Sequence, residues 1–193
     1  MDSRLYLITA ARDDLAGFLE AAVRGGVDIV QIREKALPDG ELLAVLQEAR
    51  EVTRRLGVPL VVNDRPDLAV LAEADYAHVG QDDLPVAAVR QLGLRVGQST
   101  HSAEELDRTE ADYAGVGPVH ATPTKEGRPP AGLEVVRHAA AHAQVPWFAI
   151  GGIDTSNVAE VVAAGAERIA VVRAIGDAPD PERAAAALRA ILP

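Results

Sequence analysis

The sequence predicts an α/β protein, a single-domain (β/α)8 TIM barrel spanning residues 1–193, a length that suits one domain. Short runs rich in Val and Ile recur eight times and alternate with longer amphipathic segments. The runs are apolar at nearly every position, which is typical of parallel strands buried on both faces. Polar residues gather after the carboxyl ends of the runs, where barrels of this class place their active sites.

The strands are predicted at Arg4–Thr9, Asp28–Glu34, Pro59–Asp64, Tyr76–Gln81, Arg95–Thr100, Tyr113–His120, Pro146–Gly152 and Arg168–Ile175. Helices are predicted between them at Asp13–Arg24, Asp39–Leu56, Pro66–Ala74, Leu84–Leu92, Leu133–Ala143 and Thr155–Ala164. Two further helices are marked by their first residues. Ser102 begins a capping box that ends at Glu105, and Asp180 is an N-cap followed by a proline.

A doubly wound open sheet is the alternative architecture, because its strands have the same apolar pattern. Eight units in this chain leave about 24 residues each, which is compact for a barrel that usually has about 250 residues. The barrel is favoured because the units continue without a visible switch point and because the polar residues follow so many of the strands.

Composition excludes several classes of protein. The chain has 19 basic and 29 acidic residues, and this net charge of −10 argues against a general nucleic-acid or anionic-membrane binder. No apolar window reaches the roughly 18 residues of a membrane helix. With no cysteine, disulfides, thiol catalysis and Cys-based zinc sites are excluded. The first residues lack a signal-peptide pattern, so the cytoplasm is the expected location, and the oligomeric state stays open. With few aromatic residues, the core is expected to be Val, Leu, Ile and Ala.

The second predicted strand ends in a group of polar side chains. Alternation places Gln31, Arg33 and Lys35 on one face. Two cations and an amide at the end of a barrel strand suit a polyanion, and Arg engages phosphate in a bidentate manner. The alternative is a solvated strand end.

The third and fourth predicted strands are followed by carboxylates. Asp64 follows Asn63, and Asp82 and Asp83 follow Gln81. Carboxylates from neighbouring strands can share a Mg²⁺ ion, which also takes substrate phosphates and waters. The alternative is helix capping, because each group precedes a proline at a predicted helix start.

The fifth predicted strand ends in Ser99-Thr100-His101-Ser102, which raises the possibility of a serine nucleophile. Ser102 fits better as a helix cap, and no acid is clearly placed to orient His101. We therefore expect Ser99 to act as a hydrogen-bond donor to a substrate. The other histidines His78, His138 and His142 are expected to be structural or surface groups.

Phosphate-binding features follow the last three predicted strands. Residues 117–130 form the longest loop, and two hydroxyls followed by Lys125 suit a phosphate. Gly151 and Gly152 let backbone N–H groups approach an anion, and Arg173 follows the eighth run. The loops after strands seven and eight are the usual phosphate site of such barrels.

Together these residues resemble the thiamine phosphate synthase family. The resemblance covers nearly the whole chain and rests on blocks in family order: QIREK (31–35), ND (63–64), HVGQDDL (78–84), GQSTH (97–101), GVGPVHATPTKEGRPPAGLE (115–134), AIGGID (149–154) and VVRAI (171–175). It implies a transferase that joins 4-amino-2-methyl-5-pyrimidinylmethyl diphosphate to hydroxyethylthiazole phosphate, releasing pyrophosphate.

The resemblance also implies roles for individual residues. Mg²⁺ would be held by Asp64 and Asp83, the family pattern selecting Asp83 over Asp82. The pyrimidine diphosphate would contact Gln31, Ile32, Arg33, Glu34, Lys35, Asn63, Ser99 and Lys125, of which Arg33, Lys35, Asn63, Ser99 and Lys125 are the expected catalytic residues. The thiazole phosphate would contact Thr122, Pro123, Thr124, Gly152, Val172 and Arg173.

One position departs from the family pattern, and three other functions stay open, one of which is another phosphate-binding barrel isomerase that would need a general acid/base pair. Relatives often carry Ser before the final Ala-Ile, where this chain has Arg173. A thiazole tautomerase-like isomerase on the same barrel would lack the metal carboxylates and use a histidine near Pro118. A phosphate-metabolite sensor would bind product without turnover.

Overall fold

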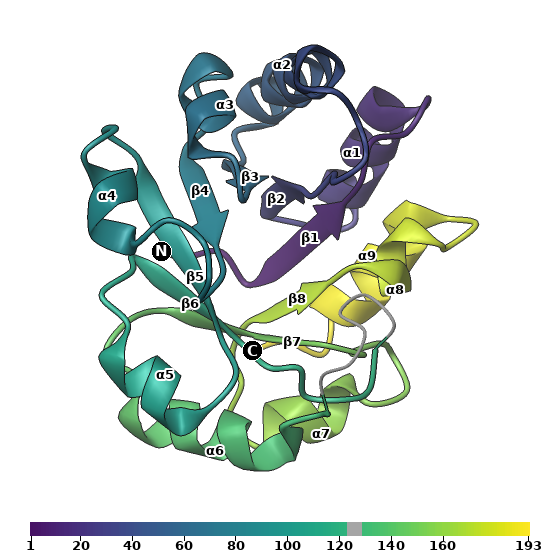
Figure 1. The fold of residues 1–193 in the computed structure, drawn as a ribbon. Coiled ribbons are helices and arrows are strands. Elements are labelled where there is room, and N and C mark those ends of the chain that lie inside the picture. The colour runs from purple at the N-terminus through teal and green to yellow at the C-terminus, as the bar shows by residue number, and fades with distance from the viewer. Residues whose placement is uncertain (123–128) are drawn as a thin grey trace.

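The structure, a computed structural model, describes residues 1–122 and 129–193 and forms a closed barrel of parallel strands in chain order (Figure 1). The strands are β1 (Leu5–Thr9), β2 (Ile29–Ile32), β3 (Leu60–Asn63), β4 (Tyr76–Val79), β5 (Arg95–Thr100), β6 (Tyr113–Val116), β7 (Trp147–Ile150) and β8 (Ile169–Val171). Pairing of β8 with β1 closes the barrel. The predicted barrel is therefore confirmed, and the open sheet is excluded.

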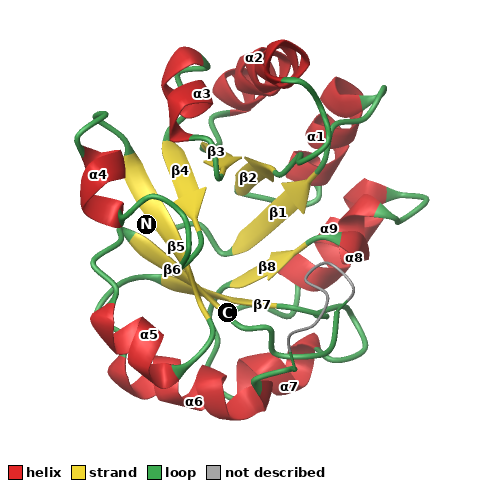
Figure 2. Cartoon of the chain, in the orientation of Figure 1, coloured by secondary structure: helices red, strands yellow, loops and turns green. Residues whose placement is uncertain are grey.

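Helices surround the barrel on the outside (Figure 2). They are α1 (Leu15–Arg24), α2 (Asp39–Leu56), α3 (Pro66–Leu71), α4 (Val86–Arg90), α5 (Ala103–Arg108), α6 (Gly132–His142), α7 (Val158–Ala163), α8 (Arg173–Gly176) and α9 (Pro181–Arg189). Ser102 and Asp180 cap α5 and α9, each accepting a hydrogen bond from a backbone N–H three residues ahead. In the described part of the chain, no helix has both the length and the apolarity needed to cross a bilayer.

Several strands end earlier than their apolar runs predict. The strand β2 stops at Ile32, β6 at Val116 and β8 at Val171. The residues after these points leave the barrel ladder and form the loops that surround its carboxyl end. The prediction of strand through Ile175 was wrong, because Arg173–Gly176 forms the helix α8.

Two separate apolar cores lie on the two faces of the strands. Leu5 and Leu7 of β1 face the helices, whereas Tyr6 and Ile8 face the barrel interior. The interior contains all three tyrosines, Tyr6, Tyr76 and Tyr113, together with Phe148. The expectation of a purely aliphatic core was therefore wrong for this layer, because a barrel axis is wide enough to need large side chains.

The interior rings pack edge to face around Tyr113. Its ring centroid lies 5.9 Å from that of Tyr6, 5.6 Å from that of Tyr76 and 5.7 Å from that of Phe148. Gly97 makes room for this ring, since a Cβ there would lie 2.1 Å from Tyr113 Cζ. The aromatic layer fills the middle of the barrel and forms the floor of the cavity described next.

Candidate active site

A cavity of about 310 Å³ opens at the carboxyl ends of the strands. Its floor is formed by Tyr6, Ile8 and Phe148 of the interior core. Its lining includes eight of the predicted substrate-binding residues, from distant parts of the chain: Gln31, Arg33, Asn63, Ser99, Thr122, Gly152, Val172 and Arg173. The fold therefore brings Gln31 and Arg33 of the predicted cationic group to one chamber with Gly152 of the predicted glycine-lined group, whereas Lys35, Asp64 and Asp83 are not among the lining residues.

Other predicted residues lie outside the cavity lining. Ile32 faces the helices, in the outer core, so only its backbone is available to a ligand. Glu34 organises the loop after β2, because its Oε1 accepts hydrogen bonds from the backbone N–H groups of Lys35 and Ala36, both at 2.8 Å. Pro123, Thr124 and Lys125 lie outside the described residues.

The acidic residues after β3 and β4 meet near Lys35. The Lys35 Nζ lies 2.8 Å from Asp64 Oδ2. Burial alone would raise the pKa of Asp64, but the hydrogen bond and positive charge of Lys35, with smaller contributions from the Asp83 and Asn63 side chains, hold that pKa below its ordinary value. Because the Asp83 side chain influences the Asp64 carboxyl, the two acids are neighbours.

The capping alternative for these acids is wrong. The N-caps of α3 and α4 are Arg65 and Pro85, and neither helix has a side-chain cap. Asp83 Oδ2 instead accepts a hydrogen bond from the Gly80 backbone N–H at 2.6 Å. Asp64 has a left-handed backbone, with φ of 60°, which is uncommon for a residue other than glycine. The Asp64 carboxylate instead meets the Lys35 ammonium, which follows β2.

The acid pair has the donor chemistry of a magnesium site. Mg²⁺ prefers oxygen ligands and typically takes one or two carboxylates, completed by phosphates and waters. Among residues 1–122 and 129–193, no three His, Cys, Asp or Glu side chains are grouped as a metal site. Asp64 and Asp83 therefore fit an ion whose remaining ligands come from substrate and water, and do not resemble a closed structural site.

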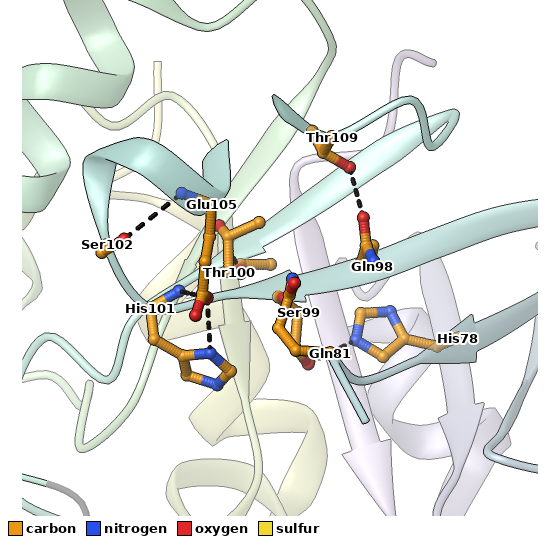
Figure 3. A network of polar contacts seen from close by, with 10 residues as sticks. His78, Gln81, Gln98, Ser99, Thr100, His101, Ser102, Glu105 and Thr109 are labelled. Atoms are coloured by element: carbon orange, nitrogen blue, oxygen red, sulfur yellow. Dashed lines mark hydrogen bonds and ion pairs between the residues drawn. The ribbon is translucent and has the colours of Figure 1, made fainter. Parts of the chain in front are cut away.

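A chain of polar side chains crosses the interior beneath the cavity. The Gln31 Nε2 donates to Tyr6 Oη, which lies 2.8 Å from Tyr113 Oη. Tyr113 Oη lies 3.1 Å from His78 Nδ1. His78 Nε2 lies 3.0 Å from Ser99 Oγ (Figure 3). Sequence reasoning missed Tyr6 and Tyr113 and treated His78 as structural. The available signal was a polar residue inside an otherwise apolar strand.

The serine-nucleophile alternative has no support in this geometry. His101 Nδ1 lies 2.9 Å from Glu105 Oε2, so an acid does orient this ring, contrary to expectation (Figure 3). The histidine that meets the Ser99 hydroxyl is His78, and its Nδ1 faces the phenol of Tyr113. A phenol in place of a carboxylate does not make the Ser–His–acid arrangement.

The part of the cavity that follows β7 and β8 is formed by Gly152 and by the N-terminus of α8. Gly152 has φ of 62°, and a Cβ there would lie 2.8 Å from both Ala121 O and His120 Cβ. Only glycine allows this close packing of the two loops. Val172 is the N-cap of α8, whose first backbone N–H groups have no partner within the helix. Gly152, Val172 and Arg173 all line the cavity.

The fold and the cavity define a TIM-barrel protein with a chamber at the carboxyl ends of its strands that is lined by polar, charged and glycine residues. A family model described as thiamine monophosphate synthase matches residues 5–175. The chain belongs to the thiamine monophosphate synthase family, and it is an enzyme, as the resemblance predicted.

Individual relatives are similar over nearly the whole chain. A thiamine-phosphate synthase of Thermobifida fusca is 55% identical over 198 residues, covering 97% of this chain and 91% of that protein. Another, of Gloeobacter violaceus, is 51% identical over 190 residues, covering 95% of this chain but 56% of that longer protein. A solved thiamine phosphate pyrophosphorylase of Pyrococcus furiosus has a TM-score of 0.87 and 32% identity, covering 97% of this chain and 94% of that one.

Proposed function

We propose that this chain condenses 4-amino-2-methyl-5-pyrimidinylmethyl diphosphate with hydroxyethylthiazole phosphate, forming thiamine phosphate and pyrophosphate. The observation that carries the proposal is one cavity whose lining brings residues at the carboxyl ends of β2, β3 and β5 together with residues that follow β7 and β8. Arg33, Asn63 and Ser99 line one half, and Gly152 and Arg173 line the other. A reaction between two phosphorylated substrates requires such a pair of subsites.

The pyrimidine diphosphate belongs on the side of β2 to β5. Arg33 lines the cavity there and supplies a planar cation that matches a phosphate. Lys35 follows two residues later in the same loop and is paired with Asp64. The aromatic and aliphatic floor of Tyr6, Ile8 and Phe148 suits the flat pyrimidine ring.

The thiazole phosphate belongs on the opposite side. Gly152 and the start of α8 direct backbone groups at the cavity, where helix starts favour anions. Thr122 adds a hydroxyl at the edge. Arg173 replaces the serine common in relatives, and its guanidinium is available to the same phosphate.

The reaction proposed for this site is a dissociative substitution. The bond between the pyrimidine methylene carbon and the diphosphate oxygen breaks, and its electron pair leaves with pyrophosphate. The thiazole nitrogen then donates its lone pair to the methylene cation, forming the carbon–nitrogen bond. Arg33 offsets the charge that develops on the leaving group, and the apolar floor of the cavity shields the cation from water. No side-chain nucleophile or base is needed.

Magnesium is the proposed cofactor. Asp64 and Asp83 would hold it, and when bound it would neutralise charge on the leaving pyrophosphate. Lys35 keeps Asp64 ionised, as the lowered pKa of that carboxyl indicates, and the ionised carboxylate is the form that binds a metal ion.

The decisive experiment is to incubate the purified protein with both substrates, with and without Mg²⁺, and to measure pyrophosphate and thiamine phosphate together. Equal formation of both products, abolished by a chelator, is the expected result. Isomerisation of a thiazole phosphate alone would instead indicate a tautomerase-like isomerase. Binding without turnover would indicate a sensor.

A further inference from the structure

Five polar side chains form a continuous hydrogen-bonded chain through the barrel interior, from β2 to β5. In order they are Gln31, Tyr6, Tyr113, His78 and Ser99. The first three are at most 2% exposed. Water therefore has little access to these three side chains, and the side chains themselves decide the direction of the hydrogen bonds between them.

The direction of each hydrogen bond follows from counting protons. A phenol has one proton to donate, and burial raises the pKa of both Tyr6 and Tyr113, so both phenols keep it. Tyr6 accepts from the Gln31 amide, so its proton goes to Tyr113. Tyr113 then gives its own proton to Nδ1 of His78. His78 carries its ring proton on Nε2 and donates it to Ser99 Oγ.

We infer that Gln31 sets the direction of this chain, and that Tyr6, Tyr113 and His78 are positioning residues that turn the Ser99 hydroxyl proton toward the cavity. Because Ser99 Oγ accepts from His78, it acts as a donor to whatever it meets in the cavity. In the opposite direction, Ser99 would give its proton to His78 and present lone pairs to the cavity.

The direction matters for an anionic ligand. A hydroxyl that donates attracts a phosphate oxygen, whereas one that presents lone pairs repels it. This step rests on the proposed function, which places the pyrimidine diphosphate beside Ser99. The direction of the chain itself does not depend on that function.

Nitrogen NMR of the histidine rings tests the inference without substrate. In protein labelled with ¹⁵N in its histidine rings, the His78 signals are identified by their loss in His78→Gln. We expect Nε2 to be protonated and Nδ1 to be unprotonated. Tyr6→Phe interrupts the row of hydrogen bonds, and Gln31→Met removes the donor that sets their direction. In both variants the Nδ1-protonated tautomer should gain population.

Tyr76→Phe is the matched control. It removes a phenol from the same layer, and its ring still packs against Tyr113. The control should keep the His78 spectrum and the turnover. Tyr6→Phe should lower turnover about tenfold, the equivalent of one hydrogen bond in the transition state.

Three results would overturn the inference: a wild-type His78 protonated on Nδ1, a wild-type His78 protonated on both nitrogens, or a spectrum unchanged by both Tyr6→Phe and Gln31→Met. If the expected tautomer is found in a protein that makes no thiamine phosphate, the inference stands and the proposed function fails. If the enzyme is active with the wrong tautomer, the proposed function stands and the inference fails.

Discussion

Replacement of one acid tests the proposed magnesium site most directly. Asp83→Asn removes the charge of the carboxylate but keeps an oxygen that can accept the hydrogen bond from the Gly80 backbone N–H. The loop after β4 should therefore keep its conformation. The matched control is Asp82→Asn, because Asp82 is an exposed neighbour with the same charge.

The size of the effect follows from the charges around Lys35. Asp64 and Asp83 carry two negative charges and Lys35 one positive charge, a formal local sum of −1 that Asp83→Asn changes to zero. For a divalent ion about 5 Å away, with an effective dielectric constant of about 60, that change costs about 2 kcal/mol. This corresponds to roughly 30-fold weaker binding.

The assay has two readouts. Binding of Mn²⁺ alone, followed by electron paramagnetic resonance, reports the affinity of the acid pair. The Mg²⁺ concentration for half-maximal product formation reports the same site during turnover. Both constants should rise for Asp83→Asn and stay near the wild-type values for Asp82→Asn. Equal effects of the two substitutions, or no effect of either, would falsify the assignment.

Three further substitutions test the two anion subsites. Arg33→Ala should lower turnover by about 10²–10³-fold, because it removes a cation that offsets leaving-group charge; near-normal kinetics would refute its role. Arg173→Ser should retain activity if the backbone holds the thiazole phosphate, and a large rise in the KM for that substrate alone would show that the guanidinium binds it. Gly152→Ala should lower the melting temperature and weaken binding of the thiazole phosphate, because the alanine Cβ would lie 2.8 Å from both His120 Cβ and Ala121 O. Unchanged melting and KM would contradict the packing argument.

Much of the site was predictable because its residues follow strand ends. Gln31, Arg33, Asn63 and Ser99 stand after or within apolar runs, and a barrel gathers such positions at one end. Local signals also located helix starts, as at Ser102, whose cap depends on residues only three positions apart.

The sequence alone determined the barrel, the polar end of the barrel and the family resemblance. It could not determine which face of each strand lies inside. Parallel strands buried on both faces are apolar on both, so alternation does not separate the interior from the helix-facing side. Only the closed tertiary structure places Tyr6, Tyr113 and His78 in the interior and joins them to Gln31 and Ser99, because their contacts link residues as many as 107 positions apart in the chain.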